Sequence, residues 1–425
     1  MQELDLGLLV RQAMMVLCLI IVAAKLGGEL MERLGQPPVL GELLAGVLLG
    51  NLSLIGFEVL EPLKHSSALT VFAEIGAILL LFEVGVEADL GQLLAVGWSS
   101  LVVAALGVVA PRVLGVWVSS YLMPDAGWLS HLFVGGTLTA TSVGITARVL
   151  KDLGKSNTKE AQIILGAAVA DDVMGLVVLA VITGLTTAAL NGSAGNGGYW
   201  RDTLWITAKA SIFLILAVVV GRFWSQRVFA YAARLRVPGV LLGLCLCFCF
   251  LTATLAGYAG LAPIVGAFAA GVVLEEVHYR PFSERGERTV PELLFPLTTL
   301  IVPVFFFLMG FRVNLQSFAS VKVLMFAGLI VVVAILGKQI CALGVIEPGV
   351  DRLVVGVGMI PRGEVGLIFA GIGSTLMLHG QPVLSQTAFS ALVLMVILTT
   401  LVTPPLLKLA FDRSGGRRPN ALPKS

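Results

Sequence analysis

Two adjacent aspartates, Asp171 and Asp172, lie within an otherwise apolar run from Ile163 to Leu179. Neighbouring side chains on a helix diverge by about 100°, so the two carboxylates cannot act together as a cap. A carboxylate in apolar surroundings favours its protonated form, whereas a cation bound to the same oxygens favours the charged form and expels the proton. The pair therefore predicts a site at which protons and cations compete. The alternative is a buried ion pair that only holds helices together, and it suits Asp171 better than Asp172.

Oxygen ligands for such a cation occur in the preceding apolar segment. Residues Thr137 to Thr146 read Thr-Leu-Thr-Ala-Thr-Ser-Val-Gly-Ile-Thr, a cluster of hydroxyls and small residues. A helix can unwind at such a cluster and present carbonyl and hydroxyl oxygens, which are the ligands that hard cations prefer. Each hydroxyl has the alternative of bonding back to its own helix.

A second interrupted segment and a lysine complete the set of candidate charges. Residues Gly356 to Gly366 contain Pro361 and several glycines, which predict another broken helix. Arg362 and Glu364 are predicted to compensate the partial charges at half-helix ends rather than to bind the ion. Lys338 lies deep within a later apolar segment and is the predicted partner of an aspartate in the pair. A pair that breaks on cation binding would add a second transported proton and net charge movement.

The composition indicates that lipid surrounds most of the chain. Of 425 residues, 57% are hydrophobic and only 13% are charged, against about 25% charged residues in soluble proteins. Ionisable residues within membrane segments are costly, so each is a functional candidate by default; Glu74 and Glu83 join this set with no role assigned. The net charge of +2 excludes a basic surface for nucleic acid, and no cofactor is predicted.

The sequence predicts an all-α polytopic membrane protein with thirteen transmembrane helices. The first is interpreted as a retained span rather than a removable signal. The apolar segments lie, with approximate ends, at 8–33, 38–55, 67–88, 92–122, 129–151, 159–190, 203–230, 238–257, 261–277, 291–311, 318–345, 350–376 and 384–410.

An internal repeat organises these segments. Short motifs recur in the same order at nearly one offset, 225 or 222 positions: Pro38–Gly46 with Pro263–Gly271, Phe82–Gly85 with Phe307–Gly310, and Val143-Gly144 with Val365-Gly366. Six segments in each repeat and one linker between them place the second repeat in the opposite orientation across the membrane. Inverted repeats of this kind are typical of secondary transporters.

Lysine and arginine predict the orientation of the chain. Far more of them lie on the side that holds the break after the first segment and the C-terminus than on the other side. The N-terminus is therefore predicted outside and the C-terminus in the cytoplasm.

Taken together, these motifs resemble those of bacterial monovalent cation:proton antiporters of the second class, specifically sodium/proton antiporters with a paired-aspartate motif. The resemblance covers nearly the whole membrane region and is carried by Gln36–Gly50, Phe72–Phe82, Thr139–Arg148, Ala170–Val173, Gly260–Pro263 and Pro361–Gly366.

The resemblance implies a role for each candidate residue. Asp172 would be the main carrier of the cation and the proton, and Asp171 the second aspartate, paired with Lys338. Thr141 and Ser142 would line the Na⁺ site. The implied function is exchange of Na⁺, with Li⁺ as a further substrate, for H⁺ by elevator-like alternating access, with net charge movement, in a bacterial inner or internal membrane.

The resemblance also implies a homodimer in contact with membrane lipids and broken helices that cross in a mobile core. Relatives that export potassium often append a soluble nucleotide-binding domain, and the short C-terminal tail disfavours that subtype. The predicted organisation is 1–66 as the first-repeat part of the dimerisation domain; 67–190 as the remaining first-repeat helices, with the core helices at 92–190; 191–236 as the linker helix; 237–315 as the second-repeat part of the dimerisation domain; 316–412 as the second-repeat core; and 413–425 as a cytoplasmic tail.

Three other functions remain open from the sequence. A K⁺/H⁺ antiporter could use the same scaffold, because neither the aspartates nor the hydroxyls define the size of the ion. An intramembrane aspartyl protease needs its two carboxylates on separate helices so that they share a water and a proton, which adjacent residues achieve poorly. A cation channel would not require the inverted repeat.

Overall fold

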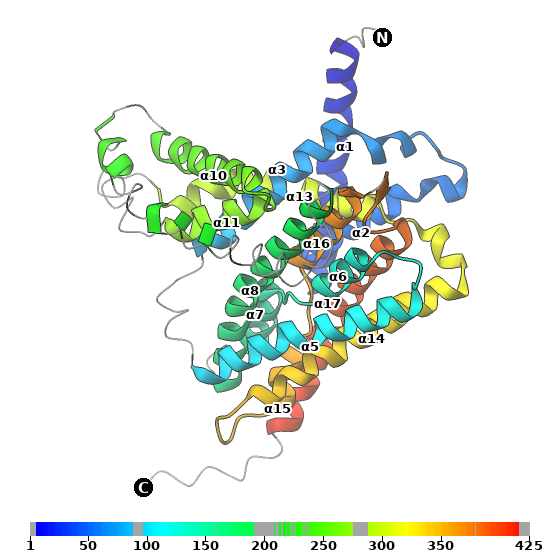
Figure 1. The fold of residues 1–425 in the computed structure, drawn as a ribbon, viewed down its shortest axis with the longest axis vertical. Coiled ribbons are helices and arrows are strands. Elements are labelled where there is room, and N and C mark those ends of the chain that lie inside the picture. Colours follow the sequence, from blue (N-terminus) through cyan, green and yellow to red (C-terminus); the bar gives the residue numbers. More distant parts are fainter. Residues whose placement is uncertain are drawn as a thin grey trace. The chain divides into compact units, whose positions relative to one another are not determined.

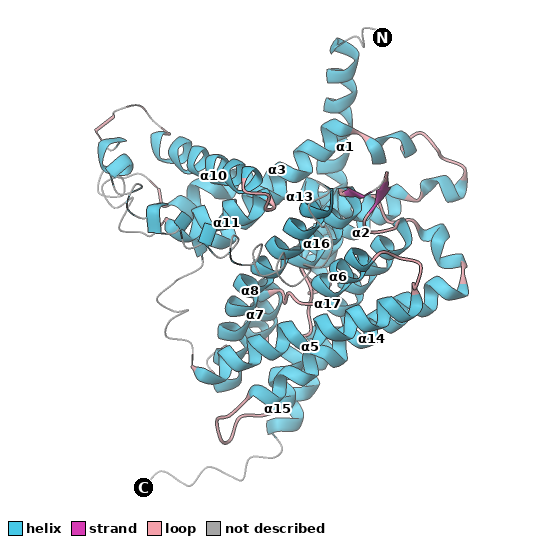
Figure 2. Ribbon diagram, viewed as in Figure 1, coloured by secondary structure: helices cyan, strands magenta, loops and turns pink. Residues whose placement is uncertain are grey.

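The computed structural model describes residues 6–87, 97–190, 239–274 and 288–415, apart from residues 157 and 379, with scattered positions between 208 and 237. Helices form nearly all of the described secondary structure (Figure 2). The chain divides into two compact units. The first consists of Met1–Leu90 and Leu179–Gln316, and the second of Gly91–Val178 and Ser317–Ser425.

The first unit is built from membrane-length helices and two shorter ones. Its helices are α1 (Leu6–Arg33), α2 (Pro38–Gly50), α3 (Ser67–Glu87), α10 (Val240–Tyr258), α11 (Pro263–Val273) and α13 (Val290–Phe311), with 3₁₀ turns at Leu52–Ile55 and Glu61–His65 (Figure 1). α13 begins with a capping box in which Thr289 and Glu292 each bond the other's backbone N–H. Pro38 and Pro263 start α2 and α11, where a missing N–H is tolerated.

Glycines of the repeated motifs lie where helices of the first unit approach most closely. A Cβ atom on Gly46 of α2 would collide with the backbone of Phe307 in α13, and one on Gly271 of α11 would collide with the backbone of Phe82 in α3. These two contacts are related by the offset of 225 positions found in the sequence. The pair α2 and α13 therefore packs like the pair α11 and α3.

The second unit contains the remaining described helices. They are α5 (Trp98–Leu122), α6 (Trp128–Thr137), α7 (Val143–Asp152), most of α8 (Lys159–Leu190), α14 (Val321–Cys341), α15 (Arg352–Gly358), α16 (Glu364–Thr375) and α17 (Gln386–Gly415), with 3₁₀ turns at Leu315–Ala319, where the second unit begins, and at Ala342–Gly344. The strands β1 (Met377–Leu378) and β2 (Gln381–Pro382) form a short antiparallel hairpin after α16. α5 and α14 run side by side along this unit (Figure 1).

Two breaks interrupt helices of the second unit. Residues 138–142 separate α6 from α7, and residues 359–363 separate α15 from α16. Pro361 lacks a backbone N–H and cannot continue α15. In the first break, small residues and hydroxyls that bond to backbone carbonyls replace the regular helical pattern. Both segments predicted to be broken are thus interrupted in the structure.

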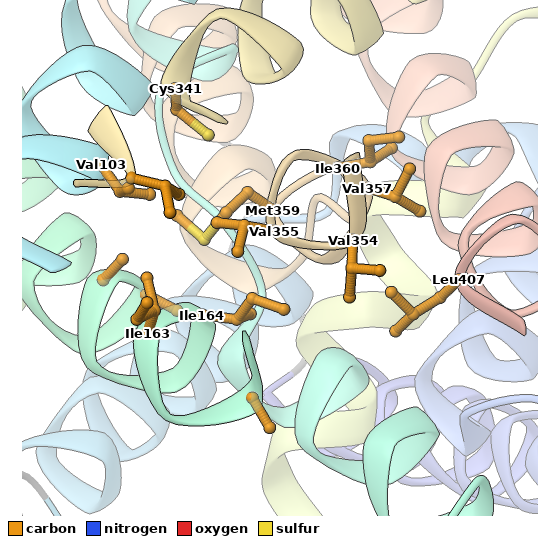
Figure 3. Close-up of a cluster of buried hydrophobic side chains, with 14 of the residues drawn as sticks. Val103, Ile163, Ile164, Cys341, Val354, Val355, Val357, Met359, Ile360 and Leu407 are labelled. Atoms are coloured by element: carbon orange, nitrogen blue, oxygen red, sulfur yellow. The ribbon is translucent and has the colours of Figure 1, made fainter. Parts of the chain in front are cut away.

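An apolar cluster packs together five helices of the second unit. It includes Val103 of α5, Ile164 of α8, Cys341 of α14, Val355 of α15 and Leu407 of α17, all of them fully buried (Figure 3). Between helices in lipid, close van der Waals contact of such side chains is a main favourable contribution to packing. The cluster holds α8, α14 and α15 in fixed register beside the charged residues that the sequence singled out.

Eight helices of the described chain are long and apolar enough to cross a membrane, and three shorter apolar helices accompany them. Residues 191–207 and much of the linker predicted at 191–236 lie outside the described residues, as do residues 416–425 of the predicted tail. The total of thirteen spans and the inverted relation of the repeats therefore stay predictions, as do the roles assigned to the domains.

Candidate functional site

Asp171 of α8 and Lys338 of α14 form a fully buried ion pair. The Nζ atom of Lys338 donates a hydrogen bond of 3.0 Å to Oδ2 of Asp171, and both side chains are 0% exposed. The other oxygen of Asp171, Oδ1, is buried without a hydrogen bond among the described residues. If one partner of such a pair is removed, the other charge remains unpaired in a low-dielectric interior, which is costly.

Asp172 lies beside this pair in a different environment. Its side chain is 6% exposed, and its Oδ1 atom is buried without a hydrogen-bond partner in the described part of the chain. The charges that act on it come from Glu364, Asp171 and Lys338. Gly175, one turn later on α8, would place a Cβ atom 3.8 Å from Ala140 and 3.9 Å from Val365. The carboxylate-bearing stretch of α8 therefore lies close to both helix breaks.

The two breaks are joined to each other by hydrogen bonds. The backbone N–H of Ser142 donates to the carbonyl of Pro361 (2.9 Å), and Thr141 Oγ1 donates to the carbonyl of Met359 (3.4 Å). Thr146, at the start of α7, donates to the carbonyl of Gly358 (2.8 Å). These bonds satisfy carbonyls that the end of α15 leaves free.

Ser142 also bonds the first residue of α16. Its Oγ atom donates to Oε2 of Glu364 at 3.3 Å. Gly363 makes this approach sterically feasible, because a Cβ atom there would lie 2.7 Å from both Cβ and Oγ of Ser142. A hydroxyl that donates its proton keeps its lone pairs, so Ser142 and Thr141 can still offer oxygens to a cation.

Arg362 is buried in the second break and binds carbonyl oxygens. Its guanidinium donates to Ala334 of α14 (3.0 Å) and, more weakly, to Ala140 (3.4 Å) and Met359 (3.5 Å). Its own carbonyl accepts a hydrogen bond from Thr400 of α17 (2.8 Å). Met359 and Ala140 lie just after α15 and α6, where a positive group opposes the negative partial charge of the helix ends.

The second unit contains all seven residues to which the sequence assigned a role: Asp171, Asp172, Thr141, Ser142, Lys338, Arg362 and Glu364. Glu74 and Glu83 belong to the first unit, where Glu83 accepts a hydrogen bond from Thr298 (3.1 Å). Sequence reasoning did not single out Thr146 or Thr400. Thr146 belongs to the hydroxyl cluster that the sequence displays, whereas no spacing or motif marks Thr400.

The chain is similar to known sodium/proton antiporters in sequence and in fold. A sequence model described as sodium/hydrogen exchanger, transmembrane, matches residues 17–411. The chain is 34% identical to the high-affinity Na(+)/H(+) antiporter NhaS3 of a Synechocystis strain, covering 93% of this chain and 89% of that protein. It is 35% identical to the Na(+)/H(+)-K(+) antiporter GerN of Bacillus cereus, covering 93% and 95% of the two chains.

A solved structure shares the fold. The sodium proton antiporter MjNhaP1 from Methanocaldococcus jannaschii superposes with a TM-score of 0.70 over 96% of this chain and 99% of that one, at 17% sequence identity.

Proposed function

Since the chain belongs to the sodium/hydrogen exchanger family of integral membrane proteins, we propose that it exchanges Na⁺ for H⁺ across a bacterial membrane through a site centred on Asp172. Its relatives are antiporters, so the chain is a transporter and not an enzyme. The aspartyl protease hypothesis is therefore set aside.

One observation carries the proposal: Asp172 is buried and its Oδ1 atom has no hydrogen-bond partner among the described residues. An ionised carboxylate in that position is costly unless a proton or a cation neutralises it. The nearby Glu364 carboxylate increases the cost of a second negative charge. Asp171 differs, because Lys338 already neutralises it.

This asymmetry yields a transport cycle. Na⁺ binds Asp172 with oxygens of Thr141 and Ser142 and displaces the proton, and a proton arriving from the other side displaces Na⁺. Either occupant neutralises the carboxylate, whereas the empty, charged site is unfavourable in the membrane interior. Na⁺ transport and proton transport are coupled because the carrier changes sides only when Asp172 has bound Na⁺ or a proton.

The carrier is proposed to move as one unit in an elevator-like step. All of the proposed ligands and the Lys338 partner belong to the second unit. Release of Lys338 from Asp171 on Na⁺ binding would free a second proton and make the exchange electrogenic.

The wider architecture extends the same proposal. It includes thirteen spans in two inverted repeats, and the matched contacts of Gly46 with Phe307 and Gly271 with Phe82 support the repeat. The proposal also includes a homodimer in contact with lipids, with the N-terminus of each chain outside and the C-terminus in the cytoplasm. No cofactor takes part, and Na⁺ and H⁺ are cargo.

Ion selectivity is the first point to test. When Na⁺ or Li⁺ is added outside proteoliposomes that contain the purified protein, the cation should enter in exchange for protons and the lumen should become more alkaline, with a smaller response to K⁺. A response to K⁺ equal to that for Na⁺ would replace the proposal with K⁺/H⁺ exchange, to which the name of GerN also points. Currents without dependence on a proton gradient would indicate a channel.

A further inference from the structure

We propose that Gly107 of α5 is a positioning residue for Lys338: the absence of a side chain at this position provides the space in which the lysine lies and keeps its ammonium group directed at Asp171. The inference rests on the proposed function, because it assigns Gly107 to the ion pair of that site. Nothing in the sequence of α5 marks this glycine among the others.

The first support is the contact itself. A Cβ atom on Gly107 would lie 3.3 Å from Nζ of Lys338 and 3.8 Å from its Cδ. The lysine side chain therefore passes directly over the backbone of α5 before it reaches Oδ2 of Asp171 at 3.0 Å. An added methyl group would press on the charged end of the side chain.

The second support is that α5 packs tightly against α14 and the turn that follows it, so these segments cannot easily separate. One turn after Gly107, Pro111 lies so close to α14 that a Cβ atom on Gly337 would sit 2.8 Å from its Cα. One turn before it, the backbone N of Val103 would lie 2.8 Å from a Cβ atom on Gly344, just beyond α14. Positions four residues apart share one face of a helix, so Gly107 is the middle contact of three.

The third support is that the Lys338 side chain is enclosed by protein. Lys338, Asp171 and the neighbouring Cys341 are all fully buried. Close-packed interiors transmit such a displacement to the next group instead of absorbing it. A methyl group at position 107 is therefore expected to shift the ammonium group away from its present distance to Asp171.

A double-mutant cycle tests the inference. The parent, Gly107→Ala, Lys338→Ala and the double variant are compared by melting temperature in detergent, by charge moved per Na⁺ in proteoliposomes and by the pH profile of exchange. Gly328→Ala is the matched control, since it lies in α14 and a Cβ atom there meets nothing within 4 Å. We expect Gly107→Ala to lower the melting temperature and to change the apparent KM for Na⁺ by about three- to tenfold.

The decisive comparison is between the effect of Gly107→Ala in the parent and its effect in the Lys338→Ala variant. Gly107→Ala should change the charge per Na⁺ and the pH profile in the same direction as Lys338→Ala, and it should have no further effect once Lys338 is alanine. Equal effects in both backgrounds would assign Gly107 to general helix packing and overturn the inference. A Gly107→Ala protein that behaves like the parent would also overturn it.

Two further outcomes stay informative. If Gly107→Ala alone does not fold, the double variant should fold as well as Lys338→Ala, and its failure to do so would contradict the inference. If the parent shows no Na⁺-driven proton flux, the proposed function fails, while the melting temperatures still decide whether Gly107 and Lys338 are coupled.

Discussion

The Nζ atom of Lys338 lies 3.0 Å from Oδ2 of Asp171, and neither side chain is exposed. The next residue, Asp172, has an oxygen with no hydrogen-bond partner in the part of the chain that the structure describes. Two identical side chains adjacent in sequence thus occupy opposite electrostatic situations, one neutralised by the protein and one left for a proton or a cation.

Asp172→Asn is expected to abolish Na⁺-driven proton flux, because an amide cannot alternate between binding a proton and binding a cation. The measurement is lumenal pH in proteoliposomes, with size-exclusion chromatography to show that the protein is folded. Asp412→Asn is the control, since Asp412 lies exposed near the end of α17 and should exchange like the parent. Retained flux in Asp172→Asn would reject the carrier role.

Lys338→Ala is expected to destabilise the protein by about 3–5 kcal/mol if Asp171 stays charged, because a buried charge then loses its partner. Adding Asp171→Asn removes that charge and should recover most of the loss, as a melting curve would show. Lys322→Ala, at an exposed position of the same helix, serves as the control. A double variant no more stable than Lys338→Ala would show that the pair does not explain the loss.

Gly363→Ala is expected to impair exchange by disturbing the crossing of the two breaks. The added Cβ atom would lie 2.7 Å from both Cβ and Oγ of the Ser142 side chain, which is the obstacle. Gly363→Ala with Ser142→Gly should regain part of the stability lost. Gly243→Ala, where a Cβ atom meets nothing within 4 Å, should leave both stability and flux unchanged.

The apparent KM for Na⁺ should rise as pH falls, because the proton and Na⁺ compete for Asp172. Lower pH increases the protonated fraction of the carboxylate, so more Na⁺ is needed to occupy half of the sites. When most of the sites are protonated, competition by one proton raises the apparent KM about tenfold for each unit by which the pH falls. Initial rates over a matrix of pH and Na⁺ concentration measure this, and a KM independent of pH would contradict a shared site.

Much of the candidate site could be predicted from single segments of the chain. Asp171 and Asp172 stand out because charges are rare in apolar runs, and Pro361 with its glycines marks a helix break because proline lacks a backbone N–H. The bond of Thr400 to Arg362 in the second break and the bond of Thr146 to Gly358 at the end of α15 could not be predicted, since serines and threonines occur widely in membrane helices and usually bond to their own backbone.

The sequence by itself determined that the chain is a polytopic helical membrane protein, that its motifs recur at offsets of 225 or 222 positions, and that the rare charges within its apolar segments are the functional candidates. Composition and periodicity are properties of each segment, so they can be read locally. Only the tertiary structure decided that Lys338 neutralises Asp171, that Ser142 bonds Glu364 and that Gly107 lies under the lysine. Those relations join residues far apart in the chain, and they depend on which faces of the helices pack together.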